Sequence, residues 1–284
     1  MRTKNHTLTA ALIRRYADHL REQERSVATI QKYAHDLTAL LEYLQGEALT
    51  KALMIGWKEA LSADHAPATV NSMLVAVNGF LRFMGWHALT VRLLKIQRPL
   101  LREEQRELSK AEYARLVDAA QRAGDERLAL ILQTICATGI RVSELRFISA
   151  EAVCSGRAEV CNKGKRRTVF LPDRLRRLLK AYLKKQKITA GAVFVTRTGR
   201  PLDRSNIWRA MKALCKSAGV EPSKVFPHNL RHLFARAYYA LEKDLARLAD
   251  ILGHSSINTT RIYTMESGAV HARQMERMGL VLTT

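Results

Sequence analysis

The sequence predicts a mainly α-helical protein of two domains, with one small β-sheet in the second domain. Its 284 residues exceed the length that one hydrophobic core usually serves. Apolar residues recur at helical spacing along most of the chain, whereas only one short stretch alternates in the manner of paired strands. We expect a helical bundle in residues 1–97, a linker in residues 98–108, and an α+β domain in residues 109–284 that ends in a C-terminal helix.

The first hundred residues have the pattern of a compact bundle of about four helices. Ser26 can cap a helix whose apolar positions recur at helical spacing up to Gly46. Pro67 opens another helix, because proline is favoured in the first turn. Flanking helices near residues 8–24 and 50–62 complete the predicted bundle.

The second domain begins with a clear helix signal. Ser109 and Glu112 stand as a capping box that opens a helix to about Ala123. The next helix, ERLALILQTICATG, is apolar on nearly all sides and is expected at the centre of the core. The alternating segments RAEVCN and RRTVFLP, joined across Lys163-Gly164-Lys165, predict a β-hairpin. Further helices are expected near residues 172–187, 203–218, 227–241, 243–252 and 255–278.

The net positive charge narrows the range of possible binding partners. The chain carries 47 lysines and arginines against 26 aspartates and glutamates, a formal net charge of +21. A molecule with this balance attracts polyanions, so nucleic acid is the first partner to consider, ahead of an anionic membrane surface or a merely solubilising exterior. The basic residues are densest in residues 157–187, where twelve of them accompany two acidic ones. Solubility alone does not require such a run.

Several classes of protein are excluded by features that the sequence lacks. No stretch approaches the roughly 18 apolar residues that a membrane span needs, and the first residues lack the apolar core of a signal peptide. The four cysteines form no Cys-x-x-Cys pair and are too sparse for a disulfide framework. We therefore expect a cytoplasmic protein with no membrane partner, no metal and no cofactor.

A few polar residues stand where periodicity does not call for them. Arg141 follows a glycine turn at the end of an apolar helix, so its charge needs either Glu144 or a bound anion as a partner. His228 and Arg231 lie three apart on one predicted helix face and can point at one anion. His228 and His232 have the spacing of a zincin motif, but Asn229 occupies the place of the catalytic glutamate.

Tyr263 follows His254 by nine residues, in the segment LGHSSINTTRIYT. A tyrosine on a helix is ordinarily a core residue, but polar residues surround this one, and we expect it to be exposed. Two arginines, two histidines, a hairpin lysine and a tyrosine are the groups that phosphoryl transfer through a phosphotyrosine requires. Guanidinium groups bind the phosphate oxygens in bidentate fashion, and titratable groups move the two protons.

Four segments carry a resemblance to a known family: TGIRVSEL (138–145), NKGKRRTVFLP (162–172), PHNLRH (227–232) and LGHSSINTTRIYT (252–264). In order and spacing they are similar to those of tyrosine recombinases of the phage-integrase and Xer type, over essentially the whole chain. The resemblance implies a SAM-like core-binding domain followed by a catalytic domain, which together clamp duplex DNA. It also implies site-specific cleavage and rejoining of DNA through a covalent 3′-phosphotyrosine, in integration, excision or dimer resolution.

The resemblance assigns a role to each of the matched residues. Arg141 and Arg231 would bind the scissile phosphate, with His254 as a third donor. Tyr263 would be the nucleophile and His228 would accept its proton. These five residues come from three of the four matched segments.

The hairpin supplies the sixth catalytic residue and most of the expected DNA contacts. Lys163 would protonate the departing 5′-oxygen. Relatives commonly have Gly-Lys-Gly-Asn-Lys here, whereas this hairpin is one residue shorter, so Lys165 is an alternative acid. The basic run is expected to contact DNA phosphates through Lys165, Arg166, Arg167, Arg174, Arg176, Arg177 and Lys180.

The expected partner is double-stranded DNA with inverted half-sites. Strand exchange joins two duplexes at four active sites, so the resemblance implies a homotetramer on DNA, or a heterotetramer with a second recombinase. No cofactor or metal is expected, because one phosphodiester is exchanged for an ester of similar energy. Such a protein is expected in the cytoplasm, on the nucleoid. The alternatives are a type IB topoisomerase-like strand transferase, a non-catalytic DNA-binding protein and an RNA-binding module, the last without aromatic stacking residues to support it.

Overall fold

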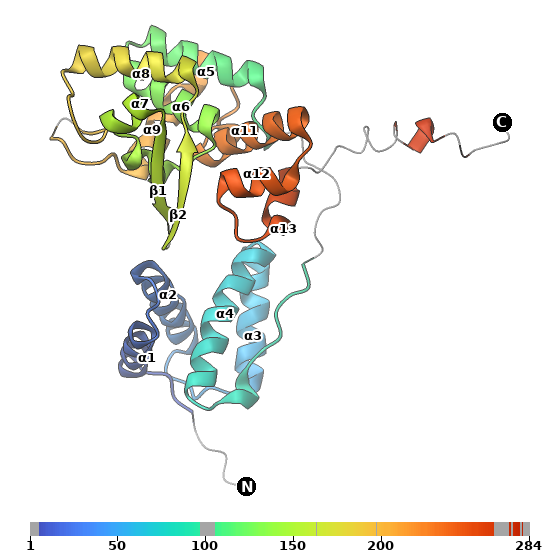
Figure 1. Ribbon diagram of the computed structural model, residues 1–284. Helices are drawn as coiled ribbons and strands as arrows, with labels where there is room; N and C mark the ends of the chain where they lie inside the picture. The colour runs from blue at the N-terminus through green and yellow to red at the C-terminus, as the bar shows by residue number, and fades with distance from the viewer. Residues whose placement is uncertain are drawn as a thin grey trace. The chain divides into compact units, whose positions relative to one another are not determined.

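The computed structural model describes residues 6–96, 106–162, 164–196 and 198–263, together with residues 273, 275–278 and 280. The chain divides into two compact units, Met1–Arg98 and Pro99–Thr284. Both are mainly helical, and a single two-stranded sheet lies in the second unit of the described chain (Figure 1). The mainly helical fold class with a small sheet is therefore confirmed.

The N-terminal unit is a bundle of four helices closed by a short 3-10 turn: α1 (Ala10–Glu22), α2 (Val27–Leu44), α3 (Lys51–Asp64), α4 (Pro67–Phe83) and the turn His87–Leu89. Side-chain oxygens cap three of the helices, because each accepts a hydrogen bond from a backbone amide of the first turn: Thr9 for α1, Ser26 for α2 and Thr50 for α3. The Ser26 cap and the Pro67 start are as the sequence predicts. The bundle encloses its own core, centred on Leu37, Leu40, Leu74 and Phe80.

Two asparagines of α4 hold the segment that follows the bundle. Asn78 is buried, and its side-chain amide donates to the carbonyl of Val91 while its oxygen accepts from the amide of Val91. Asn71 makes the same reciprocal pair with Leu94. Each side chain thus replaces the backbone partner that a neighbouring strand would supply.

The second unit is built around α6 (Glu126–Thr138), which is buried on most sides and contacts α5 (Lys110–Arg122) and α11 (Pro227–Glu242). The predicted capping box at Ser109 and Glu112 is present at the start of α5. Helix α6 ends at Gly139, whose φ of +66° is left-handed. A Cβ at this position would lie 2.6 Å from Cε1 of Phe234, so only glycine fits here.

The chain then leads into the hairpin. A 3-10 turn (Val142–Phe147) and α7 (Ala150–Ser155) precede the antiparallel strands β1 (Arg157–Asn162) and β2 (Lys165–Phe170). The predicted hairpin is confirmed, with Asn162 opposite Lys165 at its tip. The sequence pattern did not predict α7, because six residues are too few to show helical periodicity.

The remaining described elements are helical: α8 (Asp173–Gln186), α9 (Arg204–Ala213), α10 (Cys215–Ala218), the 3-10 turn Pro222–Lys224, α11, α12 (Leu245–Leu252), α13 (Ile257–Thr260) and the 3-10 turn Arg261–Tyr263. The prediction of one long helix over residues 255–278 is wrong for residues 255–263. Helix α13 has only four residues and tightens into the turn that carries Tyr263. Residues 264–272 and 274 of that predicted helix lie outside the described residues, whereas residues 273 and 275–277 are helical. Over the described chain, no helix is both long and apolar enough to cross a membrane.

Candidate active site

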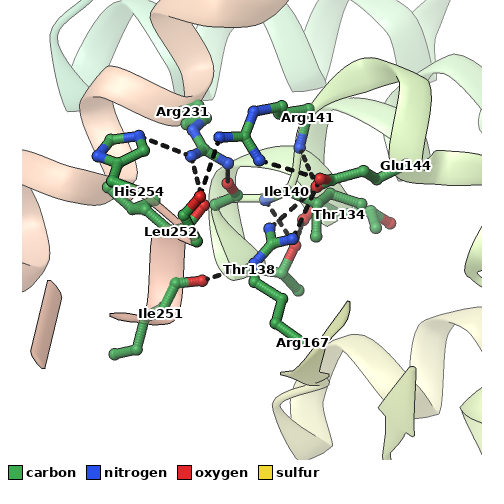
Figure 2. A network of polar contacts seen from close by, with 12 residues as sticks. Thr134, Thr138, Ile140, Arg141, Glu144, Arg167, Arg231, Ile251, Leu252 and His254 are labelled. Carbon is green, nitrogen blue, oxygen red and sulfur yellow. Dashed lines mark hydrogen bonds and ion pairs between the residues drawn. The ribbon is translucent and has the colours of Figure 1, made fainter. Parts of the chain in front are cut away.

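The last turn of α12 is the point where three arginines from distant parts of the chain converge (Figure 2). Three consecutive carbonyls each accept a hydrogen bond from a different guanidinium: Ile251 from Arg167 at 3.0 Å, Leu252 from Arg231 at 2.7 Å, and Gly253 from Arg141 at 3.4 Å. Carbonyls at a helix C-terminus lack partners within the helix and form the negative end of its dipole. The turn is therefore a natural site for cations.

Arg231, in α11, is the most buried of the three, with 1% of its surface exposed. A second arm of its guanidinium, Nη1, donates to the carbonyl of Gly139 at 2.7 Å, so it joins the end of α6 to the end of α12. Burial lowers the pKa of Arg231 to about 10, and the nearby charge of Arg141 contributes in the same direction. The group stays protonated at neutral pH and places a fixed positive charge inside the domain.

Arg141 combines a structural contact with an open face. Its Nη1 donates to Oε1 of Glu144 at 3.1 Å, and its backbone amide donates to Oε2 of the same carboxylate at 2.8 Å. The sequence left open whether Glu144 or an anion is the partner, and the structure shows that Glu144 is one partner. About a third of the Arg141 side chain remains exposed, which leaves it accessible to an anion.

Glu144 is the carboxylate that this network encloses. It is 1% exposed, and Arg167 binds both of its oxygens, at 3.1 and 2.9 Å. Burial alone would raise the pKa of Glu144, but the hydrogen bonds and charges of Arg167 and Arg141 outweigh it and hold the pKa below its ordinary value. Arg141 and Arg167 bind this ionised carboxylate, and Arg231 adds a third guanidinium, so the network drawn in Figure 2 carries a surplus of positive charge.

His254 follows the same turn and bridges two polar groups. Its Nε2 lies 3.0 Å from Nη2 of Arg231, and its Nδ1 lies 2.8 Å from Oγ1 of the buried Thr260. Because arginine can only donate, Nε2 accepts and Nδ1 carries the proton. Burial, followed by the charge of Arg231, lowers the pKa of His254 to about 4. The ring is therefore neutral at pH 7, and its Nε2 is occupied as an acceptor for Arg231.

Tyr263 lies inside the domain, with 6% of its surface exposed, and packs against Ala235, Leu248 and Leu252. The prediction of an exposed tyrosine is wrong, because its ring turns toward the apolar faces of α11 and α12, away from its polar sequence neighbours. Burial raises the pKa of Tyr263, and the charge and hydrogen bonding of Arg231 act in the opposite direction. The hydroxyl thus shares the surroundings of the buried arginine.

Two histidines of α11 complete the cluster. The rings of His228 and His232 are 4.4 Å apart, and His232 is in turn 4.9 Å from the ring of Tyr263. Burial lowers the pKa of both histidines, that of His232 to about 4, and the charge of Arg231 contributes in the same direction. Sequence reasoning gave His232 no role in this chemistry. Its position one helical turn after His228, which raised the rejected metal motif, was the available signal.

A groove of about 840 Å³ opens beside these residues. Arg141, His228 and Arg231 line one part of it, and Arg204 and Trp208 of α9 line another. The sequence did not single out either α9 residue. The structure thus brings five of the six predicted catalytic residues into one cluster, of which three reach the groove.

The sixth predicted residue, Lys163, lies outside the described residues, as does the side chain of the alternative acid Lys165. Of the basic run, Arg166, Arg174, Arg177 and Lys180 have exposed side chains. Among the described residues, no group of three histidines, cysteines or carboxylates could hold a metal ion.

Two members of the basic run point inward, and we withdraw them from the residues expected to contact phosphates. The guanidinium of Arg167 binds Glu144 and Ile251, as described above. That of Arg176 donates to the carbonyl of Val153 at 3.1 Å, to that of Cys154 at 2.8 Å and to Asp173 at 2.8 Å. Protein oxygens therefore already occupy both groups.

Comparison with known proteins agrees with this architecture. The model of the "Phage integrase family" matches residues 106–268, and that of the "Phage integrase, N-terminal SAM-like domain" matches residues 13–87. Tyrosine recombinase XerA of Pyrococcus furiosus is 27% identical, over 97% of this chain and 96% of that protein. Tyrosine recombinase XerD of Xanthomonas campestris pv. campestris is 30% identical, over 93% of this chain and 92% of that protein.

Solved structures share the fold. The XerH site-specific recombinase bound to difH substrate matches with a TM-score of 0.71 at 20% identity, over 97% of this chain and 85% of that one. A lambda integrase tetramer bound to a Holliday junction matches with a TM-score of 0.73 at 18% identity, over 92% of this chain and 78% of that one.

A SAM-like bundle followed by an integrase catalytic domain defines an enzyme that breaks and rejoins DNA strands, of the tyrosine recombinase class. The family model covers more than half of the chain. The chain belongs to the phage integrase family.

Proposed function

We propose that the protein recombines DNA at specific sites by forming a covalent 3′-phosphotyrosyl bond at Tyr263. The observation that carries this proposal is the burial of the Tyr263 hydroxyl in the field of Arg231, a fixed cation at the end of α12. A tyrosine that forms a phosphate ester needs such a cation, because attack on a phosphodiester develops negative charge on the non-bridging oxygens.

The groove beside Arg141 and Arg231 is the place that suits the scissile phosphate. The surplus positive charge around Glu144 supplies the attraction, and the contacts that fix both guanidinium groups make the donors rigid before DNA arrives. Preorganised donors of this kind need no rearrangement when charge develops in the transition state. His254 can serve as a third donor only after its Nε2 gains a proton or exchanges tautomers, because Nε2 accepts from Arg231.

Proton transfer accompanies the bond changes. Burial raises the pKa of Tyr263, so the hydroxyl needs a base, and His228 is suited because burial lowers its pKa and leaves it unprotonated at neutral pH. The tyrosine oxygen attacks phosphorus, the bond to the 5′-oxygen breaks, and that oxygen takes a proton from the hairpin lysine, Lys163 or Lys165. In the second half of the reaction, a 5′-hydroxyl from the partner duplex attacks the phosphotyrosine and releases the tyrosine.

The finer description of the substrate and the assembly is also a proposal. Solved relatives include a lambda integrase dimer bound to a COC′ core site and a tetramer bound to a Holliday junction. We propose that this chain binds double-stranded DNA with inverted half-sites and acts as a homotetramer, or as a heterotetramer with a second recombinase. The net charge of +21 and the exposed basic residues of β2 and α8 support DNA as the partner. Its place in the cell would be the nucleoid, in the cytoplasm.

Covalent trapping tests the proposed nucleophile. On a nicked suicide substrate that contains the recombination site, the wild-type protein should form a covalent complex that survives denaturation, and Tyr263→Phe should form none. Tyr239→Phe is the matched control, because it removes a hydroxyl from a tyrosine that packs against the same apolar cluster. Covalent trapping by Tyr263→Phe would place the nucleophile elsewhere. Site-independent relaxation of supercoiled plasmid by the wild-type protein would favour a topoisomerase instead.

A further inference from the structure

Arg167 is a basic residue of the hairpin that serves the interior of the domain. Its strand neighbour Arg166 is exposed, whereas only 13% of the Arg167 side chain is exposed. Opposite it in the register stands Val160, which is buried in the core. The side chain therefore leaves β2 on the inner face of the hairpin.

One half of the Arg167 guanidinium binds the carboxylate that holds Arg141. Nη1 and Nη2 donate to the two oxygens of Glu144 at 3.1 and 2.9 Å, a bidentate pair. The same two oxygens accept from the side chain and the backbone amide of Arg141. Without Arg167, the buried carboxylate would lose a bidentate partner, and the geometry of its ion pair with Arg141 would no longer be fixed from both sides.

The other half of Arg167 fixes the end of α12. Nε donates to the carbonyl of Ile251, and the aliphatic stem covers Gly253, so closely that a Cβ on this glycine would lie 2.7 Å from Cδ. The next residue is His254, whose Nε2 accepts from Arg231. The position of the His254 ring thus depends on the contacts by which Arg167 holds the preceding turn.

We propose that Arg167 is a positioning residue for DNA cleavage. It fixes the position of Arg141 through Glu144, and that of His254 through the last turn of α12. The proposal rests on the proposed function, because Arg141 and His254 matter for cleavage only as phosphate ligands. The strand that carries Arg167 also leads from the hairpin tip, so one side chain ties the strand of the predicted hairpin acid to the phosphate-binding groups. Figure 2 shows Arg167 directed toward both Glu144 and Ile251.

Arg176 provides a matched control within the same domain. It too binds a carboxylate and the carbonyls at a helix end, here those of α7, and its guanidinium lies against the glycine that ends that helix. None of its hydrogen bonds to described residues involves a predicted catalytic residue. Arg176→Met therefore removes an equivalent structural arginine, and Arg167→Met removes the one that we assign to cleavage.

Single-turnover cleavage of the nicked suicide substrate, with protein in saturating excess, distinguishes an arginine that positions groups for cleavage from one that only stabilises the fold. Arg167→Met should slow cleavage about 10- to 100-fold, the scale for disturbing a preorganised donor, without changing the salt dependence of DNA binding. Arg167→Lys should recover only part of the rate, because an ammonium cannot form the bidentate pair and reach Ile251 as well. Arg176→Met should lower the melting temperature and cleave at the wild-type rate.

A double-mutant cycle with Glu144→Gln tests the route of the effect. If Arg167 acts through Glu144, the double variant should be slower than either single variant by much less than the product of the two reductions in rate. Wild-type cleavage by Arg167→Met, or a cleavage defect with multiplicative reductions in the cycle, would overturn the proposal. Where Arg167→Met does not fold, Arg167→Lys and its cycle give the same decision. In the same assay, covalent trapping by the wild-type protein but not by Tyr263→Phe tests the proposed function. A failure of the proposed function is therefore distinguishable from a failure of the role proposed for Arg167.

Discussion

Helices α7 and α12 end in similar turns, but only the turn at the end of α12 lies among predicted catalytic residues. Both end at a left-handed glycine, Gly156 with φ of +83° and Gly253 with φ of +65°, and an arginine side chain lies against each. At α7 a single arginine, Arg176, serves two carbonyls and is balanced by Asp173. At α12 three carbonyls are served by three different arginines.

Only one of these two turns suits a phosphate, because their charges are balanced differently. At the end of α7, one cation meets one carboxylate, and Asp173 is largely exposed, so the local charge is balanced and screened by water. At the end of α12, Glu144 binds two of the three guanidinium groups, those of Arg141 and Arg167, and Arg231 and Glu144 are almost fully buried. Unbalanced positive charge away from water attracts an anion far more strongly than the same charge at the surface.

The largest effect is expected when Arg231, the buried arginine of α11 that binds the end of α12, is shortened. Arg231→Lys should lower the single-turnover cleavage rate by roughly 10²-fold or more, because one ammonium cannot contact Gly139, Leu252 and His254 together. The same exchange at the α7 end, Arg176→Lys, should leave the cleavage rate unchanged. Equal reductions in the two variants would show that the two helix ends do not differ in function.

An intermediate effect is expected on stability in acid. Burial lowers the pKa of His232 and His254 to about 4, from an ordinary value of 6.5. Between these two pH values, the two histidines bind protons in the unfolded chain but not in the folded domain. Their contribution to stability is complete above about pH 6.5 and is lost as the pH falls toward about 4. Thermal melting of the wild-type protein should show this decline.

Replacement of His232, in α11, isolates the contribution of this histidine to the decline. His232→Phe should make the decline of melting temperature between about pH 6.5 and 4 shallower, because the ring that faces His228, Arg231 and Tyr263 no longer titrates. An unaltered slope in His232→Phe would mean that this histidine is not held neutral by the fold.

The smallest effect is expected from the exposed basic residues of α8. Replacement of Arg174, Arg177 and Lys180 by glutamine should reduce the slope of log K against log salt by about 0.9 for each DNA phosphate that the variant no longer neutralises. Arg176→Gln, in the same helix, should not change the slope because its donors bind protein oxygens. A reduced slope in Arg176→Gln would return this residue to the DNA-contacting set.

Local signals were sufficient to predict most of the described fold. The caps at Ser26 and Ser109 and the hairpin all depend on residues close in sequence, and each is present. The segment around Tyr263 was predicted wrongly because its burial depends on α11 and α12, which only the tertiary fold brings to it.

The inward direction of Arg167 and Arg176 is visible in the periodicity of β2 and α8. The net charge of the basic run does not show it. Arg167 and the buried Val169 are two residues apart in β2 and so share a face, whereas Phe170, on the other face, is exposed. Arg176 precedes the buried Leu179 and Leu183 by three and seven residues, at the edge of the buried face of α8. Counting charges treats every arginine of the run alike, but the periodicity of each element separates them.

Gly139 limits how this site can vary in sequence. Its carbonyl accepts from Arg231, and its α-carbon has no room for a side chain because Phe234 and Leu252 close over it. Even a methyl group would displace Phe234, which lies on the same helix as Arg231, and would force a left-handed backbone on a residue that resists it. An alanine here would therefore disturb Arg231, the charge that we propose to bind phosphate, without replacing any charged residue.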